Sequence, residues 1–422
     1  MMNKRLVIIG GGPAGLAAAI SAYDNGITDV LIIEREPHLG GILNQCIHNG
    51  FGLHTFNEEL TGPEYALRYI DEVNKRNISY MLDTTVISLS HNKIITALSL
   101  KEGLVKIKCE AVILACGCRE RPRGQINIAG SRPAGVFSAG TCQKLVNIDG
   151  LIPGKEVVIL GSGDIGLIMA RRMTFMGAKV KCVLELMPYS SGLNRNIVQC
   201  LNDFDIPLKF SHTVVEIIGD KRLEAVKIAK VDENLKPIME TAEIIKCDTL
   251  LLSVGLIPEN ELAKGSNVVL SSTTNGAVVD DNFMTNIDGV FECGNVLHVH
   301  DLVDYVSLES SKCAISAVKY LLNKGSNFEK TQIFLSGGVR YVVPQLINKN
   351  EDYSDIDLRF RVNNVYKNVY VEVVCDDEVI YRKKRQITTP GEMETISLKE
   401  KDVRKLKQAN NIILRLVKGA NK

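Results

Sequence analysis

Two glycine-rich segments have the spacing of a phosphate-binding turn. The first spans residues 10–15 and reads GGGPAG, and the second spans residues 161–166 and reads GSGDIG. In such a turn the first glycine permits a sharp bend, the second lets the backbone approach a pyrophosphate, and the third lets a helix pack closely on a strand. The pyrophosphate then lies at the helix N-terminus, where unpaired amides and the helix dipole favour negative charge. The residues expected to line the two turns are Gly10, Gly12, Pro13, Ala14 and Gly15, and Gly161, Gly163, Asp164, Ile165 and Gly166.

Each turn lies between elements that can hold it. An apolar, strand-like run precedes each one, at residues 6–9 and 157–160, and a helix-like stretch follows. A second strand then ends in an acid, Glu34 or Glu185, which can accept hydrogen bonds from a ribose diol. The offset between the copies is 151 positions, both for the first glycines (10 and 161) and for the acids (34 and 185). One such turn can arise by chance, but the whole unit repeated at one offset predicts two dinucleotide sites, and hence electron transfer between two redox cofactors.

The composition fits a multi-domain protein of a reducing compartment. A length of 422 residues predicts two to three domains, and a net charge of +1 gives no sign of a nucleic-acid partner. The uncharged run 6–23 superficially resembles a signal peptide, but its central glycines and proline favour the dinucleotide fold, and no other uncharged span is long enough to cross a membrane. The eleven cysteines are odd in number and scattered, and no CxxC occurs, so we expect a cytoplasmic protein without a disulfide framework or a metal site.

The segments after each turn also repeat. Residues 79–110 alternate like a small β-meander and lead into an apolar strand that closes on Gly117, and residues 209–247 lead in the same way to Gly255. This duplication predicts two similar α/β domains. Residues 331–422 differ: they alternate like half-buried strands and carry 17 Lys and Arg against 12 Asp and Glu, with a basic run at 382–385. We expect a β-rich, antiparallel appended domain, whose basic run either docks a partner subunit or forms a solvated edge strand.

The motifs resemble those of the two-dinucleotide-domain flavoproteins, the class that contains glutathione reductase and thioredoxin reductase, over residues 5–325. Six segments carry the resemblance: 10–15, 39–43, 115–119, 161–166, 253–258 and 289–295. The resemblance implies FAD in the first unit, a nicotinamide cofactor in the second, and a helix starting near Asp304 whose N-terminus points at the flavin. Beyond the turns and the two acids, it implies cofactor contacts at Arg35, Gly41, Ala115, Gly117, Gly255, Gly294 and Asn295. Asn295 stands where the family usually has an Asp that holds the ribityl chain, and an amide can still hydrogen-bond a hydroxyl.

The fold class expected from the duplication and the resemblance is α/β. It has two Rossmann-like domains, for FAD and NAD, each with a β-meander insertion, and a small C-terminal β-rich domain. The expected bounds are 1–135 with 280–330 for the FAD-binding domain, 136–279 for the NAD-binding domain and 331–422 for the C-terminal domain. Glu185 favours NAD over NADP, because an acid accepts from the 2′-hydroxyl of NAD and repels the 2′-phosphate of NADP.

Both thiol pairs used by the disulfide reductases of this class are incomplete. Leu43 stands where glutathione-reductase-like enzymes have the first cysteine of CxxxxC, and Ala139 with Cys142 stands where thioredoxin-reductase-like enzymes have CxxC. Dithiol–disulfide exchange needs a second thiol to resolve the mixed intermediate. We therefore expect no redox-active disulfide.

Segments 40–54, 161–172 and 298–304 resemble more closely the NAD/FAD dehydrogenases that accompany a glycerol-3-phosphate-dehydrogenase-like flavoprotein, and the FAD/NAD subunits of opine, sarcosine and proline dehydrogenase complexes. The resemblance implies an electron-transfer subunit that links NAD(H) to a partner flavoprotein, and a homo-oligomer is compatible with it. Two alternatives stay open: an enzyme that oxidises a small amine or hydroxy acid at its own flavin, and a flavin-binding redox sensor or assembly module without turnover.

Several side chains have two interpretations. Cys46, His48 and Cys142 either face the flavin or pack in loops and core, and His298 with His300 either tune the flavin or contact solvent or a partner. The cluster Arg119, Arg121 and Arg123 binds an anionic group or forms a solvated turn. Hydride transfer between nicotinamide and flavin needs no side-chain acid or base, so the sequence nominates no catalytic residue.

Overall fold

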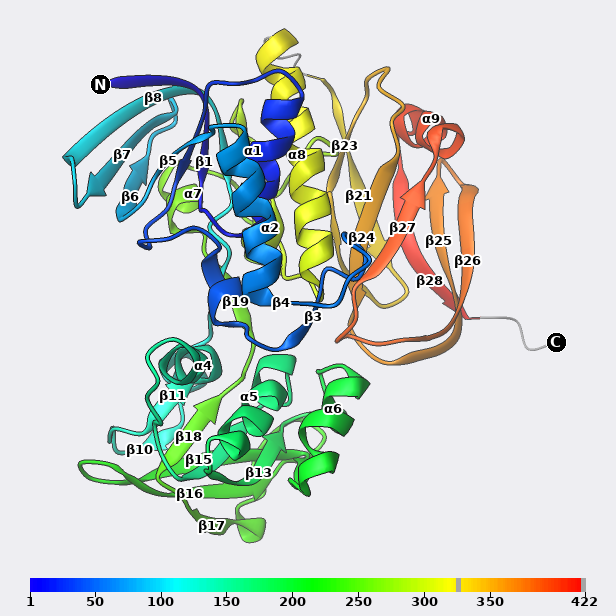
Figure 1. Cartoon of the computed structure of the whole chain (residues 1–422). Coiled ribbons are helices and arrows are strands. Elements are labelled where there is room, and N and C mark those ends of the chain that lie inside the picture. Colours follow the sequence, from blue (N-terminus) through cyan, green and yellow to red (C-terminus); the bar gives the residue numbers. More distant parts are fainter. Residues whose placement is uncertain (324–327, 419–422) are drawn as a thin grey trace. The chain divides into compact units, whose positions relative to one another are not determined.

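The computed structural model of the protein describes residues 1–323 and 328–418. The protein folds as two compact units, one made of Met1–Cys118 with Pro258–Lys422 and the other of Arg119–Ile257 (Figure 1). Residues 324–327, inside the expected range of the FAD-binding domain, and 419–422, inside that of the C-terminal domain, lie outside the described residues. The domain bounds expected from the sequence stay predictions.

A parallel sheet forms the centre of the first unit. Its strands are, in order, β5 (Ser79–Met81), β2 (Val30–Ile33), β1 (Met2–Ile9), β8 (Gly103–Leu114) and β20 (Val290–Glu292). Leu6 pairs with Val30 on one side and with Ala111 on the other. The strands read as nearly continuous apolar runs because both faces of such a sheet are covered.

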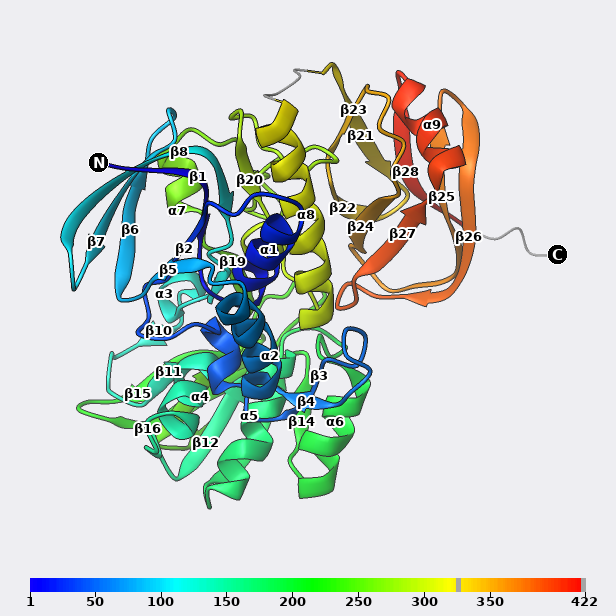
Figure 2. The ribbon, with the colours of Figure 1, turned by 45° about the horizontal axis from the view of Figure 1, so that its top comes forward.

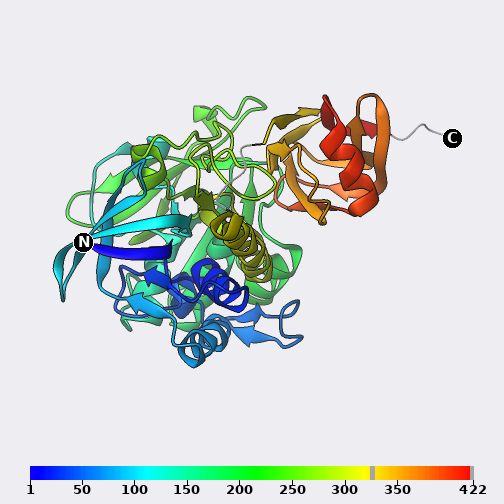
Figure 3. The ribbon, with the colours of Figure 1, turned by 90° about the horizontal axis from the view of Figure 1, so that it is seen from above.

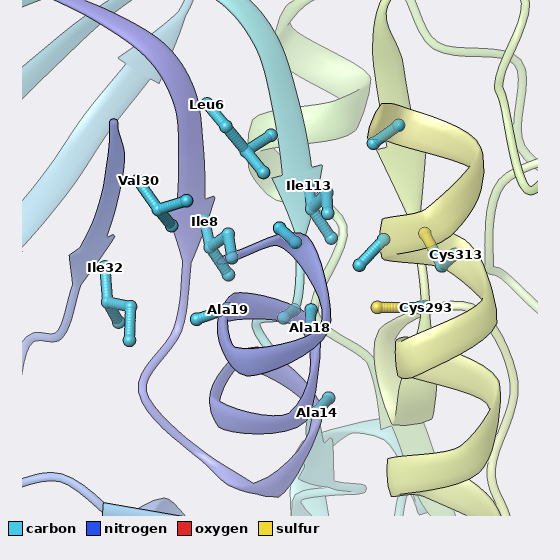
Figure 4. Packing of buried hydrophobic residues seen from close by; sticks show 14 of the residues in the cluster. Leu6, Ile8, Ala14, Ala18, Ala19, Val30, Ile32, Ile113, Cys293 and Cys313 are labelled. Atoms are coloured by element: carbon cyan, nitrogen blue, oxygen red, sulfur yellow. The ribbon is translucent and has the colours of Figure 1, made fainter. Parts of the chain in front are cut away.

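Two helices cover one face of this sheet. Helices α1 (Pro13–Asp24) and α8 (Val303–Asn323) lie side by side, and α2 (Gly62–Lys75) follows beyond α1 (Figures 1 and 3). Alternate strand residues point toward α1, and small alanines on its surface let helix and sheet approach closely (Figure 4). Shorter elements of this unit are η1 (Gly41–Gln45), β3 (Asn49–Phe51), β4 (Leu60–Thr61), α7 (Glu261–Gly265) and η4 (Gly294–Val296).

Strand β8 belongs to two different arrangements. Its first half pairs antiparallel with β7 (Ile94–Ser99), which pairs with β6 (Thr84–Leu89), and its second half runs parallel to β1 and β20. The meander expected over residues 79–110 is therefore present, and it is continuous with the dinucleotide-type sheet.

The second unit repeats the plan. Its sheet is wholly parallel, in the order β11 (Val136–Ser138), β18 (Thr249–Leu252), β12 (Glu156–Leu160), β13 (Lys179–Glu185) and β14 (Leu208–Phe210). The helices are α3 (Arg123–Ile126), α4 (Ala139–Asn147), α5 (Asp164–Phe175) and α6 (Asn194–Cys200). The β-insertion consists of β10 (Ala129–Gly130), β15 (His212–Gly219), β16 (Leu223–Lys230) and β17 (Glu243–Lys246). The predicted fold class, two Rossmann-like domains with a C-terminal β-rich region, is confirmed.

The C-terminal region has two sheets around one apolar core. The larger has the order β23 (Leu346–Asn348), β21 (Lys330–Ser336), β28 (Ile412–Lys418), β25 (Tyr366–Cys375) and β26 (Glu378–Thr388). The smaller has the order β22 (Val339–Val343), β24 (Ile356–Val362) and β27 (Glu394–Leu398). The expectation of antiparallel strands holds except for β21 and β28, which run parallel, and helix α9 (Glu400–Gln408) was not predicted.

Candidate functional site

The first glycine turn joins β1 to α1 as the sequence predicts. A Cβ on Gly10 would lie 2.3 Å from the Ala115 carbonyl oxygen, and one on Gly15 would lie 1.8 Å from the Gly10 carbonyl oxygen. Both positions therefore require glycine. Gly12 differs, because the nearest atom to its Cβ position is Gly41 Cα at 3.9 Å. The turn is tight at its first and third glycines and open at the second.

The N-cap residue of α1 is Gly12 and that of α5 is Gly163, so neither helix has a side-chain cap. By contrast, Thr61 caps α2 in a reciprocal capping box with Glu64. A helix without a cap leaves N-terminal amides available, and with the dipole they make a site for an anion. Both turns thus fit the pyrophosphate of a dinucleotide.

The acid at the end of the second strand is bound to the turn in both units. Glu34 is buried, and its carboxylate accepts from the Gly11 amide at 2.6 Å and the Glu36 amide at 2.8 Å. Glu185 accepts in the same way from the Ser162 amide at 3.0 Å and the Met187 amide at 2.9 Å. Each acid therefore fixes the shape of its turn. The Arg35 side chain is mostly exposed.

The second turn also requires glycine where the bend is sharpest. A Cβ on Gly161 would lie 2.0 Å from the Ser253 carbonyl oxygen. The Gly166 amide donates to Ser253 Oγ at 3.1 Å, and Asp164 accepts from the Leu193 amide at 2.8 Å. Ile165 follows in the first turn of α5.

Other expected residues gather around the first turn. A Cβ on Gly41 would lie 2.9 Å from Gly12 Cα, and the Gly40 amide donates to the Gly11 carbonyl at 2.9 Å. The Ala115 amide donates to the Ile9 carbonyl at 2.9 Å.

Two further expected glycines follow strand ends and have a positive φ. Gly117, beyond the end of β8, has φ 73°, and Gly255, beyond the end of β18 in the second unit, has φ 102°.

The turn after β20 is held from within the protein. Gly294 has φ +72°, and its amide donates to Glu309 Oε1 at 2.9 Å. Asn295 Oδ1 accepts from the His300 amide at 3.0 Å, and its Nδ2 lies 3.7 Å from Cys118 Sγ. The Asn295 side chain therefore shapes the loop 295–300, in addition to any contact it makes with a cofactor.

The first turn of α8 holds the loop that leads to α2. Asp304 is buried and accepts from the amides of Gly52 at 3.3 Å, His54 at 3.2 Å and Thr55 at 2.8 Å. This places segment 52–55 beside the N-terminus of α8. The helix begins at Val303, close to the expected start.

The cysteines with open interpretations have the properties of packing residues. Cys142 is buried in the core of the second unit, its Sγ lies 3.7 Å from Met173 Sδ, and burial raises its pKa to about 12. Burial likewise raises the pKa of Cys46 to about 12. A thiol with so high a pKa is a poor nucleophile at neutral pH. The half-buried His48 has its ring 5.0 Å from that of Phe51.

Arg123 donates to the carbonyls of Ile128 at 3.3 Å and Gly130 at 3.4 Å. Burial, with the nearby charge of Arg132, lowers the pKa of its guanidinium. These contacts are those of a turn residue, and Arg121 in the same cluster is exposed.

A buried polar cluster lies behind the turn at Gly294. His298 Nε2 and His300 Nε2 lie 2.8 and 3.1 Å from the two oxygens of Glu309, and Arg359 Nη1 lies 2.5 Å from Glu309 Oε2. All four side chains are buried, which excludes solvent contact for the two histidines. The sequence did not nominate Glu309 or Arg359, because their partners are distant in the chain.

The charges in this cluster follow from its geometry. A carboxylate only accepts, so both histidines donate through Nε2–H. Burial lowers the pKa of His298 to about 4, although the negative charge of Glu309 raises it. The other ring nitrogen, His298 Nδ1, has no hydrogen-bond partner. Burial alone would raise the pKa of Glu309, but the histidines facing it outweigh burial and hold that pKa well below its usual value. His298 is thus neutral and Glu309 ionised at neutral pH.

His298, His300 and Glu309 are also close enough together to suggest a metal site. However, both carboxylate oxygens already accept two hydrogen bonds, and a guanidinium, which would repel a cation, is one of the donors. The cluster is therefore better described as a hydrogen-bonded network. The absence of a metal from the protein stays a prediction.

The sequence pattern of the pyridine nucleotide-disulphide oxidoreductase family matches residues 4–348. The chain belongs to this family. Its members bind FAD and NAD(P)H, so the protein is a flavoprotein oxidoreductase with both cofactors. The matched range ends within the C-terminal region, and most of that region lies beyond it.

Two relatives and one solved structure illustrate the similarity. The hydrogen cyanide synthase subunit HcnB of Pseudomonas protegens is 25% identical over 77% of this chain and 71% of its own. The thioredoxin reductase of Ureaplasma parvum is 26% identical over 69% of this chain and 88% of its own. The crystal structure of thioredoxin reductase from T. acidophilum superposes with a TM-score of 0.63, at 23% identity, over 76% of this chain and all of that one. Among the described residues of this family member, no helix is both long and apolar enough to cross a membrane.

Proposed function

We propose that the protein is an FAD-dependent oxidoreductase that transfers electrons between NAD(H) and a partner flavoprotein of the glycerol-3-phosphate-dehydrogenase type, without a redox-active disulfide. The observation that carries the proposal is the second turn, which keeps a helix start without a cap and an acid bonded to the turn. Bound FAD would supply the ring that accepts and donates electrons. A flavin module without turnover would have no need of this second site.

The residues proposed to hold FAD are Gly10, Gly12, Pro13, Ala14, Gly15, Glu34, Arg35, Gly41, Ala115, Gly117, Gly294 and Asn295. Those proposed to hold the nicotinamide cofactor are Gly161, Gly163, Asp164, Ile165, Gly166, Glu185 and Gly255. The glycines admit the phosphates close to backbone amides, and the N-termini of α1 and α5 stabilise their charge. The two acids fix the turns and would face the ribose hydroxyls.

NAD rather than NADP is proposed as the nicotinamide cofactor. Glu185 is buried, and the three residues after it, Leu186, Met187 and Pro188, offer no cation for a 2′-phosphate. A carboxylate near that position repels a second negative charge.

A protein partner is supported by the name of HcnB, which is a subunit of a larger enzyme. A direct dithiol mechanism is disfavoured by the buried, high-pKa thiol of Cys142, with Ala139 in place of a second cysteine. Because this chain is also similar to proteins named thioredoxin reductases, the test includes a disulfide substrate.

The test is an anaerobic titration of the yellow protein with NADH and, separately, with NADPH, followed by flavin absorbance. Stoichiometric bleaching by NADH at concentrations where NADPH has little effect is expected. Absence of bleaching by either would refute the nicotinamide assignment. Bleaching by a small amine or hydroxy acid alone would favour an enzyme with its own substrate. Turnover of a disulfide such as oxidised thioredoxin with NADH would refute the exclusion of disulfide chemistry.

A further inference from the structure

Strand β24 carries charged side chains on one face. Alternate residues of the strand are apolar and belong to the core of the C-terminal region, and the residues between them face the other way. Figure 2 shows β24 on the side of the C-terminal region toward α8. Three ion pairs join this face to α8 and to the loop before it: Asp357 with Lys312 at 2.6 Å, Arg359 with Glu309 at 2.5 Å, and Arg361 with Asp301.

The middle pair reaches the turn after β20. Glu309 accepts from the Gly294 amide and from His298 and His300 as well as from Arg359. Arg359 brings a permanent positive charge against the buried carboxylate, whereas the Nε2–H of His298 adds a hydrogen bond. One carboxylate therefore couples a strand of the C-terminal region to the backbone of the turn.

The third pair holds the rest of the same loop. Besides its contact with Asp301, Arg361 donates to the Val299 carbonyl at 3.2 Å, and the Met393 amide donates to Asp301 Oδ2 at 2.6 Å. The segment from residue 294 to 301 is thus linked to β24 directly through Arg361 and, by way of Glu309, through Arg359.

We propose that Arg359 is a positioning residue of the flavin site, which acts through Glu309 to fix the turn Gly294–Asn295 and so makes the C-terminal domain a working part of FAD binding. This inference rests on the proposed assignment of that turn to FAD. It gives the appended domain a role distinct from docking a partner.

The physical reason is the cost of a buried, unpaired charge. Without the guanidinium, the buried carboxylate keeps its bonds from the two imidazoles and the Gly294 amide but loses the permanent positive charge beside Oε2. Ionised Glu309 then becomes more costly to bury, and uptake of a proton or entry of water would weaken the bond from the Gly294 amide. The turn then loses its fixed shape, and a cofactor that depends on it binds less tightly. The expected effect of Arg359→Gln is a rise of about tenfold or more in the dissociation constant of FAD.

The experiment uses the full chain, stripped of flavin and titrated with FAD, with flavin fluorescence and the visible circular dichroism of the bound flavin as readouts. Lys312→Gln is the matched control, because it removes the neighbouring ion pair of the same row and leaves the turn untouched. If the ion pairs between β24 and α8 had a merely structural role, both variants would change the dissociation constant of FAD to a similar extent. The positioning role predicts that Lys312→Gln stays within about twofold of the wild type, a difference below about 0.4 kcal/mol.

Two further variants keep the test decisive if Arg359→Gln folds poorly. Arg359→Lys keeps the charge and should restore most of the FAD affinity and the dichroism. The double variant Glu309→Gln with Arg359→Gln removes the unpaired charge and should bind FAD better than Arg359→Gln alone. Equal FAD affinity and an unchanged spectrum in folded Arg359→Gln, or equal losses in Arg359→Gln and Lys312→Gln, would overturn the inference. A wild-type protein that binds no FAD would overturn the cofactor assignment itself, together with this inference.

Discussion

Glu292 is a buried carboxyl whose ionisation opposes folding. It is the last residue of β20, its Oε1 accepts from the Ala277 amide at 2.9 Å and from Asn260 Nδ2 at 3.4 Å, and its Oε2 has no partner. Burial raises the pKa of Glu292 to about 8, despite the two hydrogen bonds. The variant Glu292→Gln keeps the shape and the acceptor and cannot ionise.

The sign and size of the effect follow from proton linkage. Below pH 4.5, the ordinary pKa of glutamate, the carboxyl is protonated in both the folded and the unfolded states and has no effect. Between pH 4.5 and about 8 it is protonated only when folded, so the free energy of unfolding falls by about 1.4 kcal/mol per pH unit. The total loss reaches at most about 5 kcal/mol and stops growing above pH 8. Glu292→Gln should therefore equal the wild type near pH 4.5 and become progressively more stable than it toward pH 8.

Urea unfolding at several pH values from 5 to 8 measures this difference. The chain contains no Trp, so far-ultraviolet circular dichroism is the suitable signal. Glu102→Gln, at an exposed position of the same unit, controls for loss of a negative charge and should show no such trend. Parallel stability curves for the wild type and Glu292→Gln over this range would refute the reasoning.

Three further predictions concern the two cofactor sites. Glu185→Gln should reduce the preference for NADH over NADPH by about tenfold, or about 1.4 kcal/mol. The preference is measured as the ratio of the half-saturating NADPH and NADH concentrations for flavin bleaching, and an unchanged ratio would contradict the role given to this charge. Gly15→Ala should lower the free energy of unfolding by about 1–3 kcal/mol and yield protein depleted of FAD, because the added Cβ would lie 1.8 Å from the Gly10 carbonyl oxygen. The control Gly265→Ala, which has open space around it, should retain flavin. Cys142→Ala should lower the free energy of unfolding by about 1 kcal/mol and leave the rate of flavin reduction by NADH unchanged. Loss of that reduction would show that the thiol takes part in the reaction.

The features that could be predicted from the sequence are those encoded locally. The glycine turns, their flanking strands and the terminal acids lie within a few dozen residues of each other. Gly10, Gly15 and Gly161 are required by close backbone approaches, such as that of Gly10 to Ala115. The repetition of the whole unit then predicted both α/β domains. The turn between β25 and β26 is also encoded locally, because Asp376 and Asp377 both have the positive φ that such a turn requires.

The features that could not be predicted depend on partners far apart in the chain. Arg359 alternates with apolar residues and so reads as the solvent face of a strand, whereas it is buried against Glu309. Helix α9 buries only Val403, Leu406 and Lys407, too few for a clear helical period. The parallel pairing of β21 with β28 joins strands at opposite ends of the C-terminal region, and no local signal specifies it.

The shared strand β8 has a consequence for synthesis of the chain. Its pairing with β7 is local, and β1 has already been made when β8 emerges from the ribosome, but β20 follows only after the entire second unit, Arg119–Ile257, has been translated. Until then the edge of β8 that β20 will cover presents unpaired backbone and the apolar residues Val112 and Leu114. An uncovered apolar edge recruits other strands. Nascent chains that end before residue 290 should therefore depend on chaperones more than the complete protein does, and premature termination in the second unit should release fragments that aggregate.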